Sequence, residues 1–343
     1  MADELPALIW SRPEWQRASE AWIAQALAGR GMAQTGPVET VLERSWSTIR
    51  RVPVEGGAVY FKASIPLLAG EAALLQALHN WRPDVTLPLI AADFERGWML
   101  LPDGGPMLRA SLKSEDDLAH AEPLMALMAG LQIDMTAHTG ELLALVPFDR
   151  RLDRLPDQFE ALLDDRSAFN IDQEDGMSGD AYHRLRALAP RFRAMCAELA
   201  SYNVPHSLHH DDFHDGNVFV DNGRYRIADW AESCVTHPFF SMLVCLRALA
   251  DRAGYPDEAT DVPEEMYPSL ARLRDLYLAP WERYEPRETL LRIFNLAWRV
   301  GMVNRALTWK AVAEAVDPAY RASQIYAVPA WLGEFLTLME RGA

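Results

Sequence analysis

The 343-residue chain contains very little lysine and no long apolar segment. Lysine occurs only three times among 33 basic residues, at Lys62, Lys113 and Lys310, so a lysine inside an apolar run calls for a specific explanation. No apolar run approaches the roughly 20 residues that span a bilayer. The first five residues, Met-Ala-Asp-Glu-Leu, are acidic and lack the basic start and apolar stretch of a signal peptide. We therefore expect a cytoplasmic protein that does not contact a membrane.

Cysteine is also scarce, with only Cys196, Cys234 and Cys245. An odd number at irregular spacing cannot form a closed set of disulfides, which agrees with a cytoplasmic location. We predict that the three are buried and act as small apolar residues.

Basic residues are fewer than acidic ones: the chain has 33 Lys and Arg and 49 Asp and Glu, which gives a net charge of −16. This balance argues against nucleic acid as a partner, which requires a basic face. It is compatible with a cationic substrate. With 50% apolar and 24% charged residues, the composition is that of an ordinary globular protein with a sizeable core.

The N-terminal third has strand-like runs around one helix, after an amphipathic helix over 14–28. The predicted strands are 38–42, 48–54, 58–63, 87–92 and 98–101, and the second helix is 68–79. A breaker cluster, Pro-Asp-Gly-Gly-Pro at 102–106, is the best candidate for a linker. We divide the chain there into a nucleotide-binding lobe, 1–102, and a lobe with the catalytic loop and substrate site, 103–343.

The remainder is mostly helical in its apolar spacing. The predicted helices are 116–145, 151–165, 179–202, 265–280, 287–315 and 324–340, and the short β-like runs are 206–209, 218–220 and 224–228. The predicted class is α+β: a small antiparallel-sheet lobe and a larger, mainly helical lobe. Ligands favour the cleft between two such units.

The densest polar cluster is His-His-Asp-Asp-Phe-His-Asp-Gly-Asn at 209–217, between two of the β-like runs. Asp212 and Asn217 are five residues apart across a glycine-containing loop. An Asn-Gly turn at 222–223 predicts a hairpin that returns Asp229 to the side of Asn217. Two oxygen ligands then converge near a free carboxylate, which is the set that phosphoryl transfer from Mg-ATP requires.

Residues 210–217, followed by Ala-Asp-Trp at 228–230, resemble the aminoglycoside phosphotransferase and choline kinase superfamily, itself related to protein kinases. There the loop commonly reads His-Gly-Asp-Leu-His-Pro-Gly-Asn, followed by Ile-Asp-Trp. The resemblance implies a two-lobed, protein-kinase-like fold. It implies that Asp212 is the catalytic base, that Asn217 and Asp229 bind Mg²⁺, and that His210 positions the loop.

The same resemblance extends upstream. Lys62 resembles the strand lysine that contacts the α- and β-phosphates of ATP, and Glu71 resembles the helix glutamate that pairs with it. Around Leu101 and Asp103 the chain resembles the hinge, whose backbone would hydrogen-bond adenine.

Two departures from the family pattern stand out. The turn at 45–48 contains no glycine where protein kinases have a Gly-rich loop, so either the backbone approaches phosphate less closely or the hydroxyls of Ser47 and Thr48 substitute. Ser241 stands where the family often has an Asp that braces the catalytic loop. We expect Ser241 to cap the following helix, with loop bracing either weaker or supplied by another group.

The prediction is a Mg-ATP-dependent kinase of a small hydroxyl-bearing molecule. Acidic segments at 153–180 and 257–265, and aromatic residues of the C-terminal helices, could bind a cationic acceptor or could be a solvated face and core. One alternative is a degenerate kinase fold that binds nucleotide without transfer. The other is a metal-dependent phosphohydrolase. Its candidate ligands are His209, His210, Asp211, Asp212, His214 and Asp215.

Overall fold

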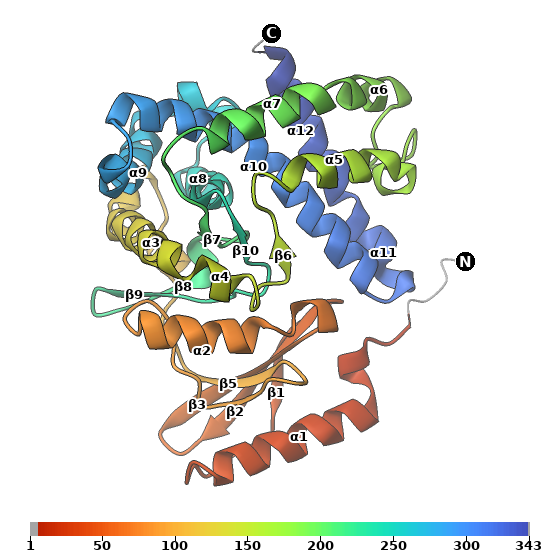
Figure 1. Cartoon of the computed structure of the whole chain (residues 1–343). Helices are drawn as coiled ribbons and strands as arrows, with labels where there is room; N and C mark the ends of the chain where they lie inside the picture. The colour runs from red at the N-terminus through yellow and green to blue at the C-terminus, as the bar shows by residue number, and fades with distance from the viewer. Residues whose placement is uncertain (1–5, 342–343) are drawn as a thin grey trace.

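The computed structural model describes residues 6–341, in which a five-stranded antiparallel sheet lies against a larger helical body (Figure 1). The spatial order is β1 (Glu39–Glu43), β2 (Ser47–Val54), β3 (Gly57–Ser64), β5 (Trp98–Pro102) and β4 (Ala91–Asp93). The prediction of α+β with a small antiparallel sheet is confirmed. Our expectations for the first five residues and for 342–343 lie outside the described residues.

Two helices cover the sheet, with α2 (Glu71–Trp81) on the face toward the helical body and α1 (Pro13–Ala28) on the other (Figure 1). The tryptophans of α1, Trp15 and Trp22, pack on Phe61 with ring centroids 6.1 and 5.8 Å apart. Because side chains alternate along a strand, Phe61 on the α1 face leaves its neighbour Lys62 on the opposite face. The helix predicted over 14–28 thus becomes the outer cover of the sheet.

The helical body contains ten α-helices within residues 6–341. They are α3 (Glu122–Met135), α4 (Thr139–Leu142), α5 (Leu155–Asp164), α6 (Gly179–Ala187), α7 (Ala189–Ala200), α8 (Ser241–Ala253), α9 (Pro268–Leu278), α10 (Arg287–Ala315), α11 (Pro318–Ile325) and α12 (Ala327–Arg341). The prediction for 287–315 coincides with α10.

Several predicted elements differ in their bounds. The helix predicted over 116–145 is divided into 3₁₀ turns, α3 and α4, and the helix over 179–202 is interrupted at Leu188, because Pro190 in the first turn of α7 cannot continue the preceding helix. The strand predicted over 87–92 forms only as β4. Two short strands were not predicted: β6 (Phe148–Asp149) and β10 (Cys234–Thr236) form a sheet with β7 (Ser207–His209).

The hairpin predicted around Asn222 and Gly223 is present as β8 (Val218–Asp221) and β9 (Arg224–Ile227). Both turn residues have positive φ, 48° and 76°, as a two-residue hairpin turn requires. The amide of Ala228 donates to the carbonyl of Asn217 at 2.8 Å. The hairpin therefore brings Asp229 back beside Asn217, as predicted.

The core has two parts, one within the helical body and one within the sheet. The sheet part also includes Val312 and Val316 from the end of α10, so this helix contacts both halves of the molecule. The three cysteines are free and buried, which confirms that prediction. Among the helices within residues 6–341, none combines the length and apolar character needed to cross a membrane.

Candidate active site

A cleft between the sheet and the β8–β9 hairpin gathers most of the predicted site residues. Its inner cavity, ≈ 280 Å³, is lined by Val41 and Ile49 on the side of the sheet and by Phe219 and Ile227 on the side of the hairpin. An adjoining cavity of ≈ 480 Å³ shares seven lining residues with it and adds Asp212. The two form one continuous cleft, with flat apolar walls at one end and charged side chains at the other.

Lys62 lies at the centre of this cleft between two carboxylates. Its Nζ is 2.8 and 2.7 Å from the two oxygens of Glu71 and 2.5 Å from Oδ1 of Asp229. Burial alone would lower the pKa of Lys62, but the charges of Asp229 and Glu71 raise it above its ordinary value. Burial, together with the charge of Asp229, raises the pKa of Glu71 above its ordinary value although Lys62 opposes the shift. The ammonium is thus a fixed positive charge whose partners come from α2 and from the end of the hairpin.

Asp229 has an unusual backbone conformation, with φ of 63°. Left-handed geometry in a residue other than glycine costs free energy and persists where the surroundings impose it. Here the next residue imposes it, because Trp230 is buried and its amide donates to Oε1 of Glu71 at 2.9 Å. The result is a carboxylate that is 43% exposed, directed into the cleft.

Asn217 and Asp212 are linked across their loop. The amide Nδ2 of Asn217 donates to the backbone carbonyl of Asp212 at 2.9 Å and approaches its Oδ2 at 3.4 Å. With its NH₂ group engaged in this way, Asn217 presents its Oδ1 oxygen to the cleft that it lines. The hairpin contact places that oxygen on the same side as Asp229.

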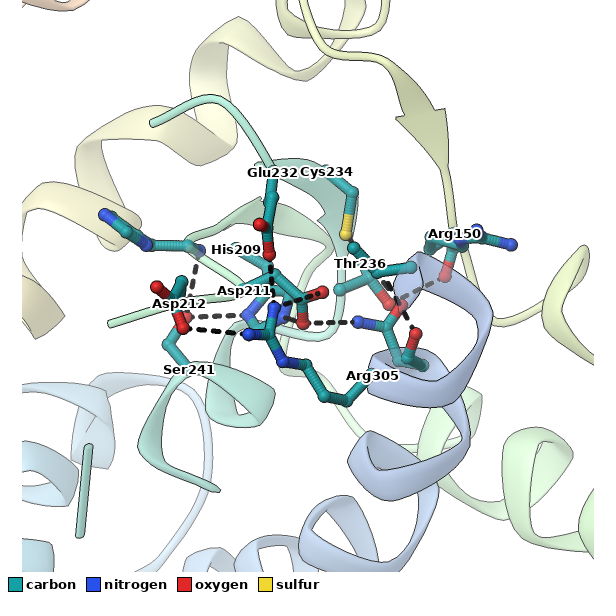
Figure 2. Close-up of polar contacts among 12 residues, drawn as sticks. Arg150, His209, Asp211, Asp212, Glu232, Cys234, Thr236, Ser241 and Arg305 are labelled. Atoms are coloured by element: carbon teal, nitrogen blue, oxygen red, sulfur yellow. Dashed lines mark hydrogen bonds and ion pairs between the residues drawn. The ribbon is translucent and has the colours of Figure 1, made fainter. Parts of the chain in front are cut away.

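Asp212 forms an ion pair with Arg305 of α10, Oδ1 to Nη2, at 2.8 Å (Figure 2). Burial alone would raise the pKa of Asp212, but Arg305, with His214 and His210, lowers it well below its ordinary value. The side chain is nevertheless 29% exposed and lines the cleft. Asp212 is therefore a carboxylate with one oxygen held by Arg305 and the other near His214.

Arg305 also contacts the two other carboxylates of the cluster, as Figure 2 shows. Its Nη1 lies 3.4 Å from Asp211 Oδ2 and donates to Glu232. Asp211 is buried and accepts a further hydrogen bond from Asn304 of α10 at 2.9 Å. Burial raises the pKa of Glu232 to about 7 even though Arg305 opposes the shift. A single buried guanidinium thus fixes three carboxylates beside the cleft.

Ser241 braces the loop from inside and does not cap the helix that follows, so that prediction was wrong. Its hydroxyl lies 2.8 Å from Nδ1 of His209 and accepts from the amide of His210 at 3.2 Å and from Gln132 at 3.1 Å. The residue before α8, Phe240, makes no side-chain cap. Since the loop consumes the hydroxyl, none is left for the helix N–H groups.

Ser241 lacks the negative charge of the Asp that the superfamily often has at this position, and Asp211 supplies a carboxylate in its place. His209 Nε2 donates to Asp211 at 2.7 Å, which leaves Nδ1 to accept from the Ser241 hydroxyl. The resulting chain of contacts runs from Ser241 through His209 and Asp211 to Arg305. The sequence left open whether the loop is braced more weakly or by another group, and in the structure Asp211 is that other group.

His210 acts on the backbone and does not reach the reacting end of Asp212. Its Nε2 donates to the carbonyl of Ala228 at 2.9 Å, and its ring packs on Trp230 with centroids 4.6 Å apart. Burial lowers the pKa of His210 to about 4, so the ring is neutral at physiological pH. This contact ties the loop to the strand end that carries Asp229.

The other end of the loop is held by His214 and two arginines. His214 Nδ1 accepts from the amide of Gly216 at 2.9 Å, and its Nε2 lies 3.4 Å from Asp212 Oδ2. The buried carboxylate of Asp215 pairs with Arg252 at 2.9 Å and with Arg109 at 3.7 Å. A β-carbon on Gly216 would lie 1.7 Å from Arg109 Nη2, so glycine is what allows the guanidinium to lie against this loop.

The remaining predicted nucleotide-binding residues are divided between cleft and core. Leu101 and Asp103 line the inner cavity, and Ser47 lines the outer one. Thr48 lines neither cavity: it is buried, and its hydroxyl donates to the carbonyl of Leu42 at 3.1 Å. Neighbouring residues on a strand point to opposite faces, so only Ser47 can offer its hydroxyl to the cleft.

The ligand set of a metal-dependent phosphohydrolase is not assembled. His209 and Asp211 turn into the buried contacts with Ser241 and Arg305, whereas Asp212 faces the cleft. Within residues 6–341, no group of three or more His, Cys, Asp or Glu side chains is arranged to hold a metal ion.

The features considered for a cationic acceptor lie mostly away from the cleft. No residue of 153–180 or 257–265 lines either cavity. Trp281 and Trp298 are buried in the core, while Trp309 lines the outer cavity and meets Trp46 edge-on with centroids 5.7 Å apart. Of these aromatic residues, Trp309 is therefore the one that contacts the sheet lobe at the cleft.

Sequence reasoning missed Arg109 and Arg305 as site residues, and it considered Asp211 only as a ligand of a metal-dependent phosphohydrolase. Asp211 carried a signal, because it stands where the superfamily loop commonly has glycine. Arg109 and Arg305 lie in a turn and in a regular amphipathic helix, and nothing local distinguishes them from surface arginines. Their positions depend on the tertiary packing of distant segments.

The chain matches no protein-family model and no curated protein sequence, but its three-dimensional structure has clear neighbours. Choline kinase from Cryptosporidium parvum Iowa II has a TM-score of 0.55 at 14% identity, over 89% of this chain and 90% of that one. Macrolide 2'-phosphotransferase type I has a TM-score of 0.54 at 17% identity, over 90% and 97%.

Aminoglycoside phosphotransferase APH(4)-Ia is similar at a TM-score of 0.52 and 12% identity, over 96% of this chain and 99% of that one. A variant of that enzyme has been solved with AMP-PNP and hygromycin B. Identities this low establish the fold alone, which is the two-lobed, protein-kinase-like fold predicted from the sequence. The chemistry of this chain has to be argued from its own residues.

Proposed function

We propose that this chain, which has the fold of small-molecule kinases, transfers the γ-phosphate of ATP to a hydroxyl group of a small molecule. The observation that carries the proposal is the convergence of Lys62, Asn217, Asp229 and Asp212 in one cleft, from the strand β3, the loop before β8 and the end of the β8–β9 hairpin. A nucleotide-binding protein without transfer would need the first three and would have no use for an accessible carboxylate at Asp212.

Each residue has a distinct role in this proposal. The flat apolar end of the cleft takes the adenine ring, against the backbone at Leu101 and Asp103. Lys62, kept charged by Glu71 and Asp229, neutralises the phosphates. Asp212 orients the acceptor hydroxyl and receives its proton. In this proposal the lobe before residue 102 binds the nucleotide, and the lobe after it carries the catalytic loop.

The residues present fit a magnesium ion. Mg²⁺ prefers one or two protein oxygens together with phosphate oxygens. Asn217 presents Oδ1 because its Nδ2 is engaged by Asp212, and Asp229 keeps Oδ2 free while Oδ1 contacts Lys62. When bound, the ion would neutralise charge on the transferring phosphate.

The ion pair with Arg305 sets how Asp212 can act. Its low pKa makes it a weak proton acceptor in the resting cleft, so its first contribution is to orient the hydroxyl. Proton transfer then follows as charge moves onto the departing ADP, which is consistent with a loose phosphoryl-transfer transition state. Arg305 keeps one oxygen of Asp212 in place throughout and leaves the other for the acceptor.

The first experiment compares Asp229→Ala and Asp212→Asn with the wild type and with an exposed control, Asp153→Ala. Mg-ATP binding is measured by calorimetry, and ADP release is measured with a panel of aminoglycosides, macrolides, amino alcohols and sugars. We expect Asp229→Ala to abolish magnesium-supported ATP binding. We expect Asp212→Asn to retain binding and to lose turnover by ~10²-fold or more.

Normal turnover by Asp212→Asn would remove the assignment of the base. Failure of the wild type to bind Mg-ATP would reject the kinase function as a whole. ATP binding without Asp212-dependent release on any acceptor would favour the nucleotide-binding alternative.

A further inference from the structure

Two arginines in the outer cavity have no role in the function proposed so far. Arg44 comes from the turn between β1 and β2, and Arg109 comes from the segment after the hinge. Four cationic side chains line this cavity, Arg44, Lys62, Arg109 and Arg305, against three acidic ones, Asp212, Asp229 and Glu232. In a chain of net charge −16, this is a local reversal of charge that favours an anion.

The two arginines differ from the other cations of the cavity in what holds them. Lys62 and Arg305 are buried, and the Lys62 ammonium and both terminal nitrogens of Arg305 are paired with carboxylates. The Arg44 side chain is exposed and makes no hydrogen bond or ion pair with any residue from 6 to 341. Arg109 is 42% exposed, and its nearest carboxylate, on Asp215, is held more closely by Arg252. Both guanidinium groups therefore have donors to spare.

Each arginine is also positioned by a specific contact. The indole of Trp10 donates to the backbone carbonyl of Arg44 at 2.7 Å, which fixes the turn at its base. Arg109 Nη2 lies 3.2 Å from His214 Nδ1, in the space that Gly216 leaves open. Arg109 is thus linked through His214 to Asp212, which lines the same cavity.

The absence of glycine from the β1–β2 turn explains why arginine side chains would be needed to bind phosphate here. A Gly-rich loop binds phosphate through backbone N–H groups, and here the turn has no glycine and the Thr48 hydroxyl is already consumed. Guanidinium groups bind phosphate oxygens through paired, charge-assisted hydrogen bonds. We infer that Arg44 and Arg109 form an anion-binding site in the cleft that takes a phosphate group, in place of the backbone donors of a glycine loop.

This inference rests on the proposed function, and two sources could supply the phosphate. It is either the terminal phosphates of ATP or an anionic group on the acceptor. The test uses Arg44→Ala and Arg109→Ala, with Arg51→Ala as the matched control, because Arg51 lies on β2 and pairs with Glu39 outside the cleft.

The first arm titrates Mg–AMP-PNP and, separately, AMP into each protein by calorimetry. If the site serves the terminal phosphates, each of the two variants loses roughly tenfold or more in affinity for Mg–AMP-PNP and keeps its affinity for AMP. Arg51→Ala should match the wild type with both ligands. Arg44→Lys should recover part of the loss, because it restores the charge without the paired donors.

The second arm titrates inorganic phosphate into protein already saturated with Mg–AMP-PNP. Phosphate binding that the wild type shows and the two variants lack, with unchanged nucleotide affinity, assigns the site to an anionic acceptor. Unchanged binding in both arms overturns the site. Loss of Mg–AMP-PNP binding in Asp229→Ala, measured in parallel, keeps this outcome separate from failure of the kinase function.

Discussion

Arg305 brings one positive charge to a point where the carboxylates of Asp211, Asp212 and Glu232 meet. Its own side chain is 5% exposed. A buried charge that loses its partner is costly, because neither water nor another group replaces the lost interaction. Arg305 therefore supports the fold and the geometry of the proposed base through the same contacts.

We expect Arg305→Met to lower the free energy of unfolding by about 3–5 kcal/mol. The comparison variant is Arg299→Met on the same helix, whose pair with Glu264 is more exposed and is worth about 1 kcal/mol or less. Urea denaturation of both variants measures the difference. Equal losses would show that Arg305 contributes only as an ordinary surface pair does.

Gly216 offers a second test at the scale of one residue. In Gly216→Ala the new methyl group has to displace the Arg109 guanidinium, which is the end of a flexible side chain. We expect a small loss of stability, about 1 kcal/mol or less, and a clear loss of Mg–AMP-PNP affinity. Retained affinity for Mg–AMP-PNP would mean that Arg109 does not contribute to nucleotide binding from this position. Thermal unfolding and calorimetry on the same preparation separate the two effects.

The N-terminal segment is more than a cover for the sheet. Trp10 donates to the carbonyl of Arg44, and Ser11 Oγ donates to Glu43 at 3.1 Å, so residues before α1 hold the end of β1 and the start of the β1–β2 turn. Arg50 of β2 returns a hydrogen bond to the Trp10 carbonyl at 3.0 Å. These contacts give the turn a fixed shape that its own sequence, without glycine, would not specify.

We expect Trp10→Phe, which keeps an aromatic ring and removes the indole donor, to lower stability by about 1 kcal/mol. We also expect faster hydrogen exchange at the amides of residues 43–47. Trp22→Phe, in a helix packed on the far face of the sheet, is the control. Exchange in the turn that is equally fast in both variants would contradict the role given to Trp10.

Elements with strong local signals were predicted well from the sequence. The Asn-Gly turn dictates its hairpin, and α10 has uninterrupted helical spacing over 29 residues. Breaks within apolar helical runs, as at Leu188, were missed because apolar spacing outweighed the effect of a single proline. The two-residue strand β6 has too few residues to carry a period, and it exists only because β10 lies beside it.

The same holds for the candidate site, where residues with a local sequence signal were predicted and those positioned by distant segments were not. Residues in the loop motif, Asp212 and Asn217, could be proposed from sequence spacing, and the structure places them in one cleft with Lys62. The role of Ser241 could not be inferred, because its hydroxyl is directed by His209 and Gln132 from other segments. Thr48 was misjudged because strand orientation decides which of two adjacent hydroxyls reaches the cleft.

For the molecule as a whole, buried titratable groups make stability depend on pH. The folded state raises the pKa of Glu232 from 4.5 to about 7, so it binds more protons than the unfolded state between these values. The stability from this group is present below pH 4.5 and is lost as the pH rises to 7. Burial lowers the pKa of His210 to about 4 and of His237 to about 3, so these two groups act in the opposite direction below pH 6.5.

The contribution of Glu232 is isolated by comparing the wild type with Glu232→Gln across pH 4.5 to 8. We expect the stability of the wild type relative to the variant to fall between pH 4.5 and 7, by up to about 1.4 kcal/mol per pH unit. Urea midpoints at matched ionic strength provide the measurement. A difference that does not change with pH would mean that Glu232 is ionised throughout.

Because α10 reaches from the Arg305 cluster to the sheet, the two lobes are attached both at the hinge after β5 and along the end of α10, where Trp309 meets Trp46 and where Val312 and the following Val316 enter the sheet core. Across the cleft, Lys62 and Asp229 form a further contact. Val312 lies about 11 Å along the helix from Arg305, at 1.5 Å per residue. A body attached at two points rotates most easily about the line that joins them. We therefore expect the cleft to open around this axis by separating Lys62 from Asp229, with Arg305 and Asp212 moving least. Nucleotide could then exchange while the ion pair that orients the base stays intact.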